Sequence, residues 1–157
     1  MMAFPICDEC ASSIVLCPRC REKERRGEIS ELDVLVSTIL KRHGATGYEA
    51  LRDLGSKLVI FASESEAPII IGTRGNTAQE LSKKLGRRVV VLVRGWNKER
   101  IIASLARPSR IVAVNRVFQQ DGTEVLKMIL DRPLDEETAK LAKELAGDVE
   151  IDYERRS

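Results

Sequence analysis

The 157-residue chain has a single histidine, His43, and few aromatic residues. That histidine falls near the expected end of a helix, where it fits a capping role, and it leaves no convincing Ser-His-Asp or Cys-His set for nucleophilic catalysis. The G-x-x-x-x-G-K-[ST] motif, which cradles nucleotide phosphates, is also missing. We therefore expect a protein that is not an enzyme and takes no small-molecule substrate.

Long apolar runs are missing too. No stretch approaches the roughly 18 apolar residues that a transmembrane helix needs. The first ten residues lack the basic region and apolar run of a secretory signal. We therefore expect a cytoplasmic protein without a membrane partner. The apolar share of 43% still allows a real core.

Cysteine is absent after residue 20, and the four cysteines form two pairs, Cys7-x2-Cys10 and Cys17-x2-Cys20. Each pair supplies half of a tetrahedral shell, and four thiolates leave no open position for catalysis. The spacing predicts one structural Zn²⁺ in a zinc ribbon or knuckle, whose binding would supply much of the folding free energy. Disulfides do not suit a cytosolic chain, and a redox Cys-x2-Cys motif would not come as a duplicate.

The net charge of +2 hides an uneven distribution. Residues 72–116 hold eleven basic and two acidic residues, whereas residues 1–71 hold nine and eleven and residues 117–157 hold six and eleven. A concentrated basic segment fits a protein that binds a polyanion at one place. Charge alone fits a solvated surface equally well.

Apolar periodicity and turn residues predict two successive sets of elements. The first set comprises helices at 30–43 and 46–54, a strand at 57–63, a short helix at 67–71, a helix at 77–85 and a strand at 87–94. The second comprises a helix at 98–106, strands at 110–118 and 123–130, a helix at 135–146 and a strand at 149–153. Residues 21–27 fit a linker or a helical extension.

A glycine loop, Gly72-Thr73-Arg74-Gly75, lies between two predicted helices at the start of the basic segment. A G-x-x-G motif alone often occurs by chance, so its setting matters. Glycine permits tight turns and lets a nucleic-acid backbone approach without a Cβ in the way. The N–H groups and dipole of the following helix favour phosphate oxygens, and Arg74 adds a cation. A groove beside such a loop takes roughly four unpaired nucleotides.

The run IIIGTRGNTAQELSKKLGRRVVVLVRGW resembles the KH core of the archaeal NusA-like transcription factor family. The following run, NKERIIASLARPSRIVAV, resembles that family's linker helix and its entry into a second KH unit. The resemblance covers about residues 30–157 and implies a type II KH domain. It also implies RNA-backbone contact at the glycine loop. The candidate RNA-binding residues are Gly72, Thr73, Arg74, Gly75, Asn76, Lys83, Lys84, Arg87 and Arg88.

The four basic candidates after the loop fit a solvated helix end as well as a phosphate track. Trp96 could stack on a base, although a single Trp after a strand is more often a packing anchor. The chain also departs from the family where a second glycine loop should stand. There it has Asp131-Arg132-Pro133-Leu134 followed by acidic residues, which disfavour a phosphate. We expect a degenerate KH-like unit, or a surface that docks protein.

The predicted architecture is therefore α+β in three parts: a four-cysteine zinc ribbon with a charged linker at 1–27, a type II KH domain at 28–97, and a degenerate KH-like α/β unit at 98–157. The predicted function is binding of single-stranded RNA near RNA polymerase, in archaeal transcription elongation or termination. Alternatives are a ribosome-associated factor that binds ribosomal RNA in assembly, translation control or hibernation, and a protein–protein adaptor with a vestigial KH core. A zinc-dependent binder of duplex DNA is disfavoured, because the positive charge lies on the KH core.

Overall fold

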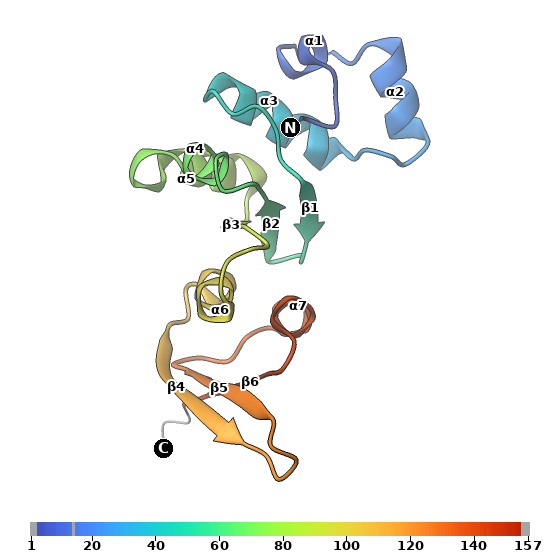
Figure 1. Cartoon of the computed structure of the whole chain (residues 1–157). Coiled ribbons are helices and arrows are strands. Elements are labelled where there is room, and N and C mark those ends of the chain that lie inside the picture. The colour runs from blue at the N-terminus through green and yellow to red at the C-terminus, as the bar shows by residue number, and fades with distance from the viewer. Residues whose placement is uncertain (1–2, 14, 155–157) are drawn as a thin grey trace. The chain divides into compact units, whose positions relative to one another are not determined.

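The computed structural model describes residues 3–13 and 15–154 (Figure 1). The chain divides into two compact units, unit 1 up to Arg94 and unit 2 from Gly95. Each unit contains one three-stranded sheet and its own helices, which confirms the predicted α+β class. None of the described helices has the length and apolar character needed to cross a membrane.

Unit 1 is built around a mixed sheet. Its elements are α1 (Asp8–Ala11), α2 (Pro18–Arg25), α3 (Glu31–Arg42), β1 (Ala50–Asp53), β2 (Lys57–Phe61), α4 (Ala67–Ile71), the 3-10 turn η1 (Thr73–Gly75), α5 (Asn76–Leu85) and β3 (Arg88–Leu92). The central strand β2 runs antiparallel to β1 and parallel to β3. All five β2 residues are buried, and α4 and α5 contact β3. This packing holds the glycine loop beside the end of α4.

Helix α3 begins where its sequence indicates. Ser30 accepts a hydrogen bond from the Asp33 N–H at 3.2 Å, and the Asp33 carboxylate accepts one from the Ser30 N–H at 2.9 Å. This reciprocal capping box satisfies two N–H groups that lack intrahelical partners. Val36, Ile39 and Leu40 then form the buried face of the helix. The predicted helix is confirmed.

The helix predicted at 46–54 is wrong, because residues 50–53 form strand β1. The Thr46–Glu49 pair does not act as a capping box. The backbone N–H and hydroxyl of Thr46 both donate to the buried Glu66 carboxylate, and Glu49 pairs with Arg94. Sheet pairing with β2 therefore overrides the local helix signal.

The N-terminal segment also differs from the predicted zinc ribbon. Ribbons are built from β-hairpins, but residues 3–13 and 15–27 contain two short helices and no strand. Both Cys-x2-Cys pairs lie where helices begin, and α2 runs through residues 21–25 in place of a linker. The helical extension suggested for residues 21–27 is the alternative that the structure supports.

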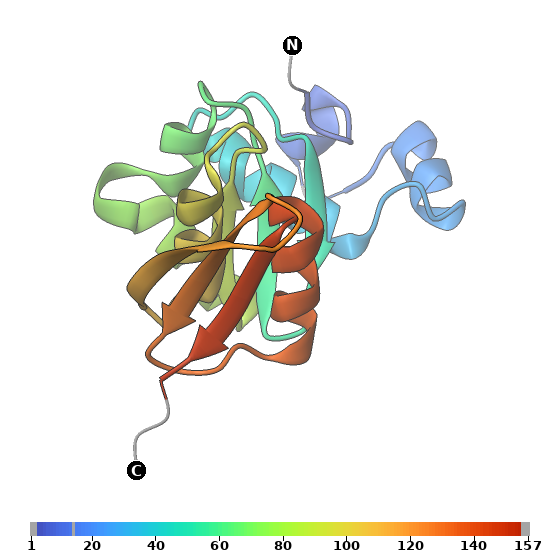
Figure 2. The same cartoon turned by 60° about the horizontal axis from the view of Figure 1, so that its bottom comes forward.

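Unit 2 repeats the strand arrangement of unit 1. Its elements are α6 (Lys98–Ala106), β4 (Ile111–Phe118), β5 (Glu124–Leu130), α7 (Glu136–Ala146) and β6 (Val149–Tyr153). The central strand β5 runs antiparallel to β4 and parallel to β6. Helices α6 and α7 contact each other on one face of this sheet (Figures 1 and 2). Both units therefore share the order helix, strand, strand, helix, strand, because residues 50–53 form β1 where the sequence predicts a helix. Among the described residues, η1 and the preceding helix α4 belong to unit 1 alone.

Candidate metal centre and nucleic-acid interface

Each cysteine pair occupies the same two positions of a helix. Cys7 and Cys17 are the N-cap residues of α1 and α2, and Cys10 and Cys20 are the third residues of those helices. N-cap and third-residue side chains lie on the same side of a helix start, as they do in a capping box. Two helix starts therefore present two sulfurs each to a common point.

The four sulfurs lie close enough to share one ion. All four Sγ atoms are within 4.8 Å of one another. Cys7 Sγ is 3.3 Å from Cys10 Sγ and 3.8 Å from Cys17 Sγ. A tetrahedral ion with metal–sulfur bonds of about 2.3 Å separates its sulfurs by about 3.8 Å. The cluster therefore fits a closed, four-coordinate metal site, as the sequence predicts.

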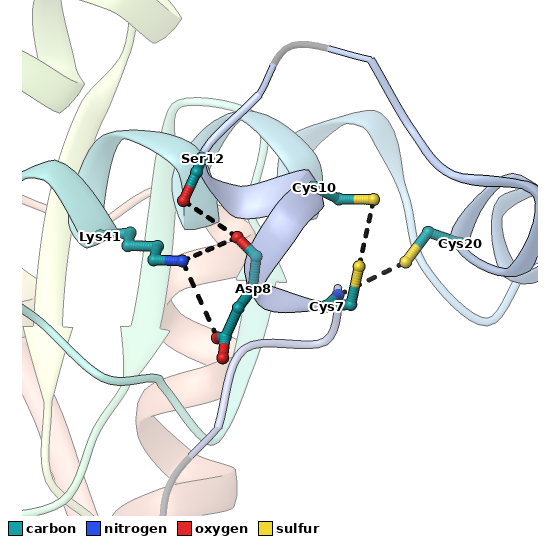
Figure 3. Close-up of polar contacts among 6 residues, drawn as sticks. All are labelled: Cys7, Asp8, Cys10, Ser12, Cys20 and Lys41. Atoms are coloured by element: carbon teal, nitrogen blue, oxygen red, sulfur yellow. Dashed lines mark hydrogen bonds and ion pairs between the residues drawn. The ribbon is translucent and has the colours of Figure 1, made fainter.

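Backbone N–H groups cross between the two pairs. The Cys17 N–H donates to Cys10 Sγ at 3.1 Å. The Cys7 N–H donates to Cys20 Sγ at 3.4 Å (Figure 3). Each N-cap residue thus contacts the sulfur of the other pair. These bonds favour negatively charged sulfur and orient the thiolates toward a cation.

Protonation differs among the cysteines. Burial raises the pKa of Cys10 to about 12 and also raises the pKa of Cys20. The hydrogen bond from the Cys20 N–H lowers the pKa of Cys17 to about 6. Four thiolates this close repel one another, so a divalent cation is needed to hold all of them deprotonated.

The cysteine segment is fixed to the rest of unit 1. Lys41 Nζ, at the end of α3, donates to the Asp8 carbonyl at 2.7 Å (Figure 3). The Phe4 and Tyr48 rings meet edge to face with centroids 6.0 Å apart. A Cβ at Gly47 would lie 2.6 Å from Ala3 Cα. The metal site is therefore packed against α3.

The glycine loop adopts a backbone shape that favours glycine. Gly72 has φ 80° and ψ 171°, a region used almost only by glycine. Arg74 (φ 55°) and Gly75 (φ 78°) are both left-handed. A Cβ at Gly72 would lie 2.7 Å from the Thr77 backbone nitrogen and closer still to Thr77 Oγ1. The loop therefore brings bare backbone against the first turn of α5.

Helix α5 begins without a side-chain cap, since its N-cap is Gly75. Of the described helices with eight or more residues, α2, α3, α6 and α7 all begin with a side chain that accepts an N–H. The first N–H groups of a helix have no intrahelical acceptor. The Asn76 N–H donates to the Thr73 carbonyl within η1, but no side chain accepts an N–H of this first turn, and the helix dipole favours an anion there.

The structure places the candidate RNA-binding residues in two groups. Gly72, Thr73, Arg74, Gly75 and Asn76 form the loop and the first residue of α5, and Thr73, Arg74 and Asn76 are exposed. Lys83, Lys84 and Arg88 are exposed at the other end of α5 and the start of β3. Within the described part of the chain, these three and Arg74 have no ion-pair partner. Arg87 differs, because its guanidinium pairs with Asp53.

The two side chains considered for other roles both have partners. His43 is the C-cap residue of α3, as the sequence predicts, and its Nε2 contacts the Glu80 carboxylate on α5. The Arg100 guanidinium lies 3.6 Å from the centre of the Trp96 ring, so one face of that ring is occupied.

Thr77 is the residue at this site that sequence reasoning missed. The sequence identifies it only as a helix start. Its position two residues after the second glycine is the signal that could have drawn attention to it.

The corresponding turn of unit 2 is closed to anions. Asp135 is the N-cap of α7, and its carboxylate accepts the Thr138 N–H at 2.8 Å. Glu136 and Glu137 follow in the first turn. Negative charge already occupies the position where a phosphate would bind.

Comparison with known proteins gives only distant likenesses. No family model matches the chain, and no curated protein matches it. A solved structure entitled "Crystal structure of APE1850" is 20% identical over 76% of this chain and 94% of its own, with a TM-score of 0.40. The periplasmic domain of the T3SS inner membrane protein PrgH from S. typhimurium is 14% identical over 88% of this chain and 82% of its own, with a TM-score of 0.30. Neither likeness assigns the chain to a family.

Proposed function

We propose that unit 1 is a type II KH-like module that binds single-stranded RNA through Gly72-Thr73-Arg74-Gly75, in a NusA-like role in transcription. The observation that carries the proposal is the pairing of this loop with the uncapped start of α5. Bare glycine backbone lets a phosphate approach, and the open helix start supplies N–H donors to it.

The element order supports the same proposal. From α3 to β3, unit 1 runs helix, strand, strand, helix, helix, strand, with the glycine loop between the two helices. This is the order that the resemblance to the NusA-like family implies. The central strand β2 is parallel to β3 and antiparallel to β1, so the helix pair crosses between parallel neighbours.

Charge supports an RNA ligand over a neutral one. Arg74 lies in the loop, and Lys83, Lys84 and Arg88 are exposed at the far end of α5. Such cations neutralise phosphates and release counterions, so binding should weaken as salt rises. Arg87 already pairs with Asp53 and would contribute less than the others.

We also propose that the four cysteines hold one structural Zn²⁺. Four sulfur donors in a closed arrangement suit this ion, and they leave no position for a substrate. The ion would stabilise the short segment that packs against α3. It would take no direct part in RNA binding.

The first experiment replaces Thr73 and Arg74 with Asp and measures the affinity for a short, unstructured RNA. Two carboxylates beside the open helix start should repel phosphate and abolish binding, while circular dichroism shows an unchanged fold. The control replaces the exposed Gln119 and Gln120 of unit 2 with Asp, which adds the same two carboxylates at another exposed turn, and Arg74→Gln accounts separately for the lost cation. Equal affinity of the loop variant and the parent would refute the assignment of the loop.

A second experiment identifies the assembly in which the protein acts. Purification of the tagged protein from its own cells should recover RNA polymerase if the role is in transcription. Recovery of ribosomal subunits without polymerase would replace that role with the ribosome-associated alternative, while RNA binding by the loop would stand.

A further inference from the structure

Thr77, the second residue of α5, is a largely buried residue beside the glycine loop. The residue is only 4% exposed. Within the described residues, its hydroxyl makes no hydrogen bond. Other hydroxyls in unit 1 do find acceptors, since Ser82 donates to the Ala78 carbonyl at 2.9 Å and Thr38 to the Val34 carbonyl at 2.8 Å. Among the described residues, the fully buried side-chain oxygen without a hydrogen-bond partner is Thr138 Oγ1 and not Thr77 Oγ1. The Thr77 hydroxyl is therefore unpartnered but can still be reached by an acceptor from outside.

The hydroxyl lies against the glycine loop. Thr77 Oγ1 and the Thr77 backbone nitrogen both border the space that a Cβ at Gly72 would occupy. With glycine there, a hydroxyl and an N–H of the first turn meet beside bare backbone. This turn is also the one that no side chain caps.

We propose that the Thr77 hydroxyl donates a hydrogen bond to a non-bridging phosphate oxygen of the bound RNA, and so forms a single-phosphate site with the first-turn N–H groups of α5. The inference rests on the proposed RNA binding of unit 1, and it adds an uncharged residue that contacts the phosphate. Hydroxyl and N–H donors aimed at one point recognise an oxyanion by geometry.

Thr77 and Arg74 would bind the same RNA through different interactions, a hydrogen bond from a neutral group and a charge attraction. Arg74 is exposed, so it contributes mainly through charge, and its contribution falls as salt rises. The Thr77 hydroxyl carries no charge, so its contribution should persist at high salt. The salt dependence of binding therefore separates the two residues.

The test compares three variants with the parent protein. Thr77→Val keeps the shape of the side chain and removes only the hydroxyl, whereas Thr77→Ser keeps the hydroxyl. For a short, unstructured RNA, Thr77→Val should bind about tenfold more weakly, because a hydrogen bond to a charged group is lost. Thr77→Ser should bind nearly as the parent does. Arg74→Gln should reduce the slope of log affinity against log salt by about 0.7, while Thr77→Val leaves the slope unchanged.

A second measurement uses inorganic phosphate as the probe and follows the backbone amides of Gly72, Asn76 and Thr77 by NMR. The parent and Thr77→Ser should show saturable shifts that Thr77→Val lacks. If Thr77→Val binds RNA as tightly as the parent, the hydroxyl only packs under the loop and the inference is overturned. If the parent binds phosphate at these amides but no RNA, the proposed function fails while the phosphate site stands. If it binds neither, both fail.

Discussion

Helices α5 and α7 occupy equivalent places in two units of the same design, yet their first turns have opposite chemistry. Each helix leads into a third strand that lies parallel to the central strand of its sheet. Helix α5 begins at a left-handed glycine with no side-chain cap, whereas α7 begins at Asp135, whose carboxylate accepts the Thr138 N–H. The shared element order therefore does not determine whether the first turn of the helix can accept an anion. That property depends on the residues of the turn itself.

The charge of the surrounding sequence also differs between the two helix starts. Residues 72–94 of unit 1 carry six basic residues and one acidic residue, whereas residues 95–157, which make up unit 2, carry eleven and twelve. A phosphate at the start of α5 would lie in a basic segment, and one at the start of α7 would meet Asp135, Glu136 and Glu137. We therefore expect no phosphate binding at the start of α7.

The largest predicted effect is the loss of folded structure on metal removal, which we expect in unit 1 and not in unit 2. Removing the ion with a chelator, or replacing Cys10 with Ser, should unfold residues 3–29, because structural zinc sites contribute on the order of 10 kcal/mol. The buried cluster around the site is small and includes Ile6, Cys10 and Ile29. Hydrogen exchange should show lost protection there and unchanged protection in β4 and β5. Ser13→Ala, which alters the same segment away from the sulfurs, should change nothing.

Metal analysis completes this prediction. One zinc per chain is expected for the parent protein and none for Cys10→Ser. A metal-free parent in which residues 3–29 keep their full protection would show that packing alone holds the segment together.

The next predicted effect is a difference in stability between alanine substitutions at two glycines with positive φ. Gly72→Ala should lower the free energy of unfolding by about 3 kcal/mol, because it combines a strained backbone with a clash against Thr77. Gly122→Ala, in the β4–β5 turn, has φ 87° but no atom within 4 Å of the new Cβ. Its cost should be about 1 kcal/mol, from backbone strain alone. Urea unfolding of both variants checks the difference, and equal costs would contradict the crowded geometry at Gly72.

A smaller effect concerns the N-terminal side-chain cap, which α7 has and α5 lacks. Asp135→Ala should destabilise unit 2 by about 1 kcal/mol, because the Thr138 N–H loses its acceptor. The change should not create RNA binding, because Glu136 and Glu137 stay in place. Thermal unfolding and an RNA titration measure the two outcomes.

Local signals predicted most of the fold, since helices α3, α5, α6 and α7 end or begin at recognisable caps. The wrong helix prediction for residues 46–54, where the structure has β1, shows the limit of local signals. Thr46 and Glu49 have the spacing of a capping box, but their partners, Glu66 and Arg94, are distant in sequence. Only the tertiary structure brings those partners near, so the strand could not be predicted from the local pattern.

The metal site and the loop were predictable for a different reason. Cysteine spacing and G-x-x-G are properties of a few adjacent residues, so the sequence contains them in full. The helical starts at Cys7 and Cys17, the uncapped start of α5 and the unpartnered Thr77 hydroxyl depend on contacts in space. Those contacts decide how the site works, and the sequence alone does not contain them.

The smallest predicted effect compares two aspartates in equivalent turns. In the β1–β2 turn the Asp53 carboxylate accepts the Gly55 N–H at 2.8 Å, and in the β4–β5 turn Asp121 accepts the Thr123 N–H at 3.0 Å. The Gly55 N–H and then Arg87 lower the pKa of Asp53, whereas the Thr123 hydroxyl and N–H lower the pKa of Asp121. Asp53 alone of the two has a cation beside it.

A carboxyl whose pKa is lowered by folding stabilises the folded state above its unfolded pKa of about 3.9, and this stabilisation is lost as pH falls through the lower folded value. Asp53→Asn should therefore cost a few tenths of a kcal/mol at neutral pH, because the pair with Arg87 is half exposed. The difference from the parent should shrink below about pH 4, where the parent's own carboxyl becomes protonated. Urea unfolding at neutral and acidic pH measures it, with Asp121→Asn as the matched variant. If the stability difference between Asp53→Asn and the parent stays the same in acid, the effect comes from the hydrogen bond of the turn. The ion pair with Arg87 would then contribute nothing measurable.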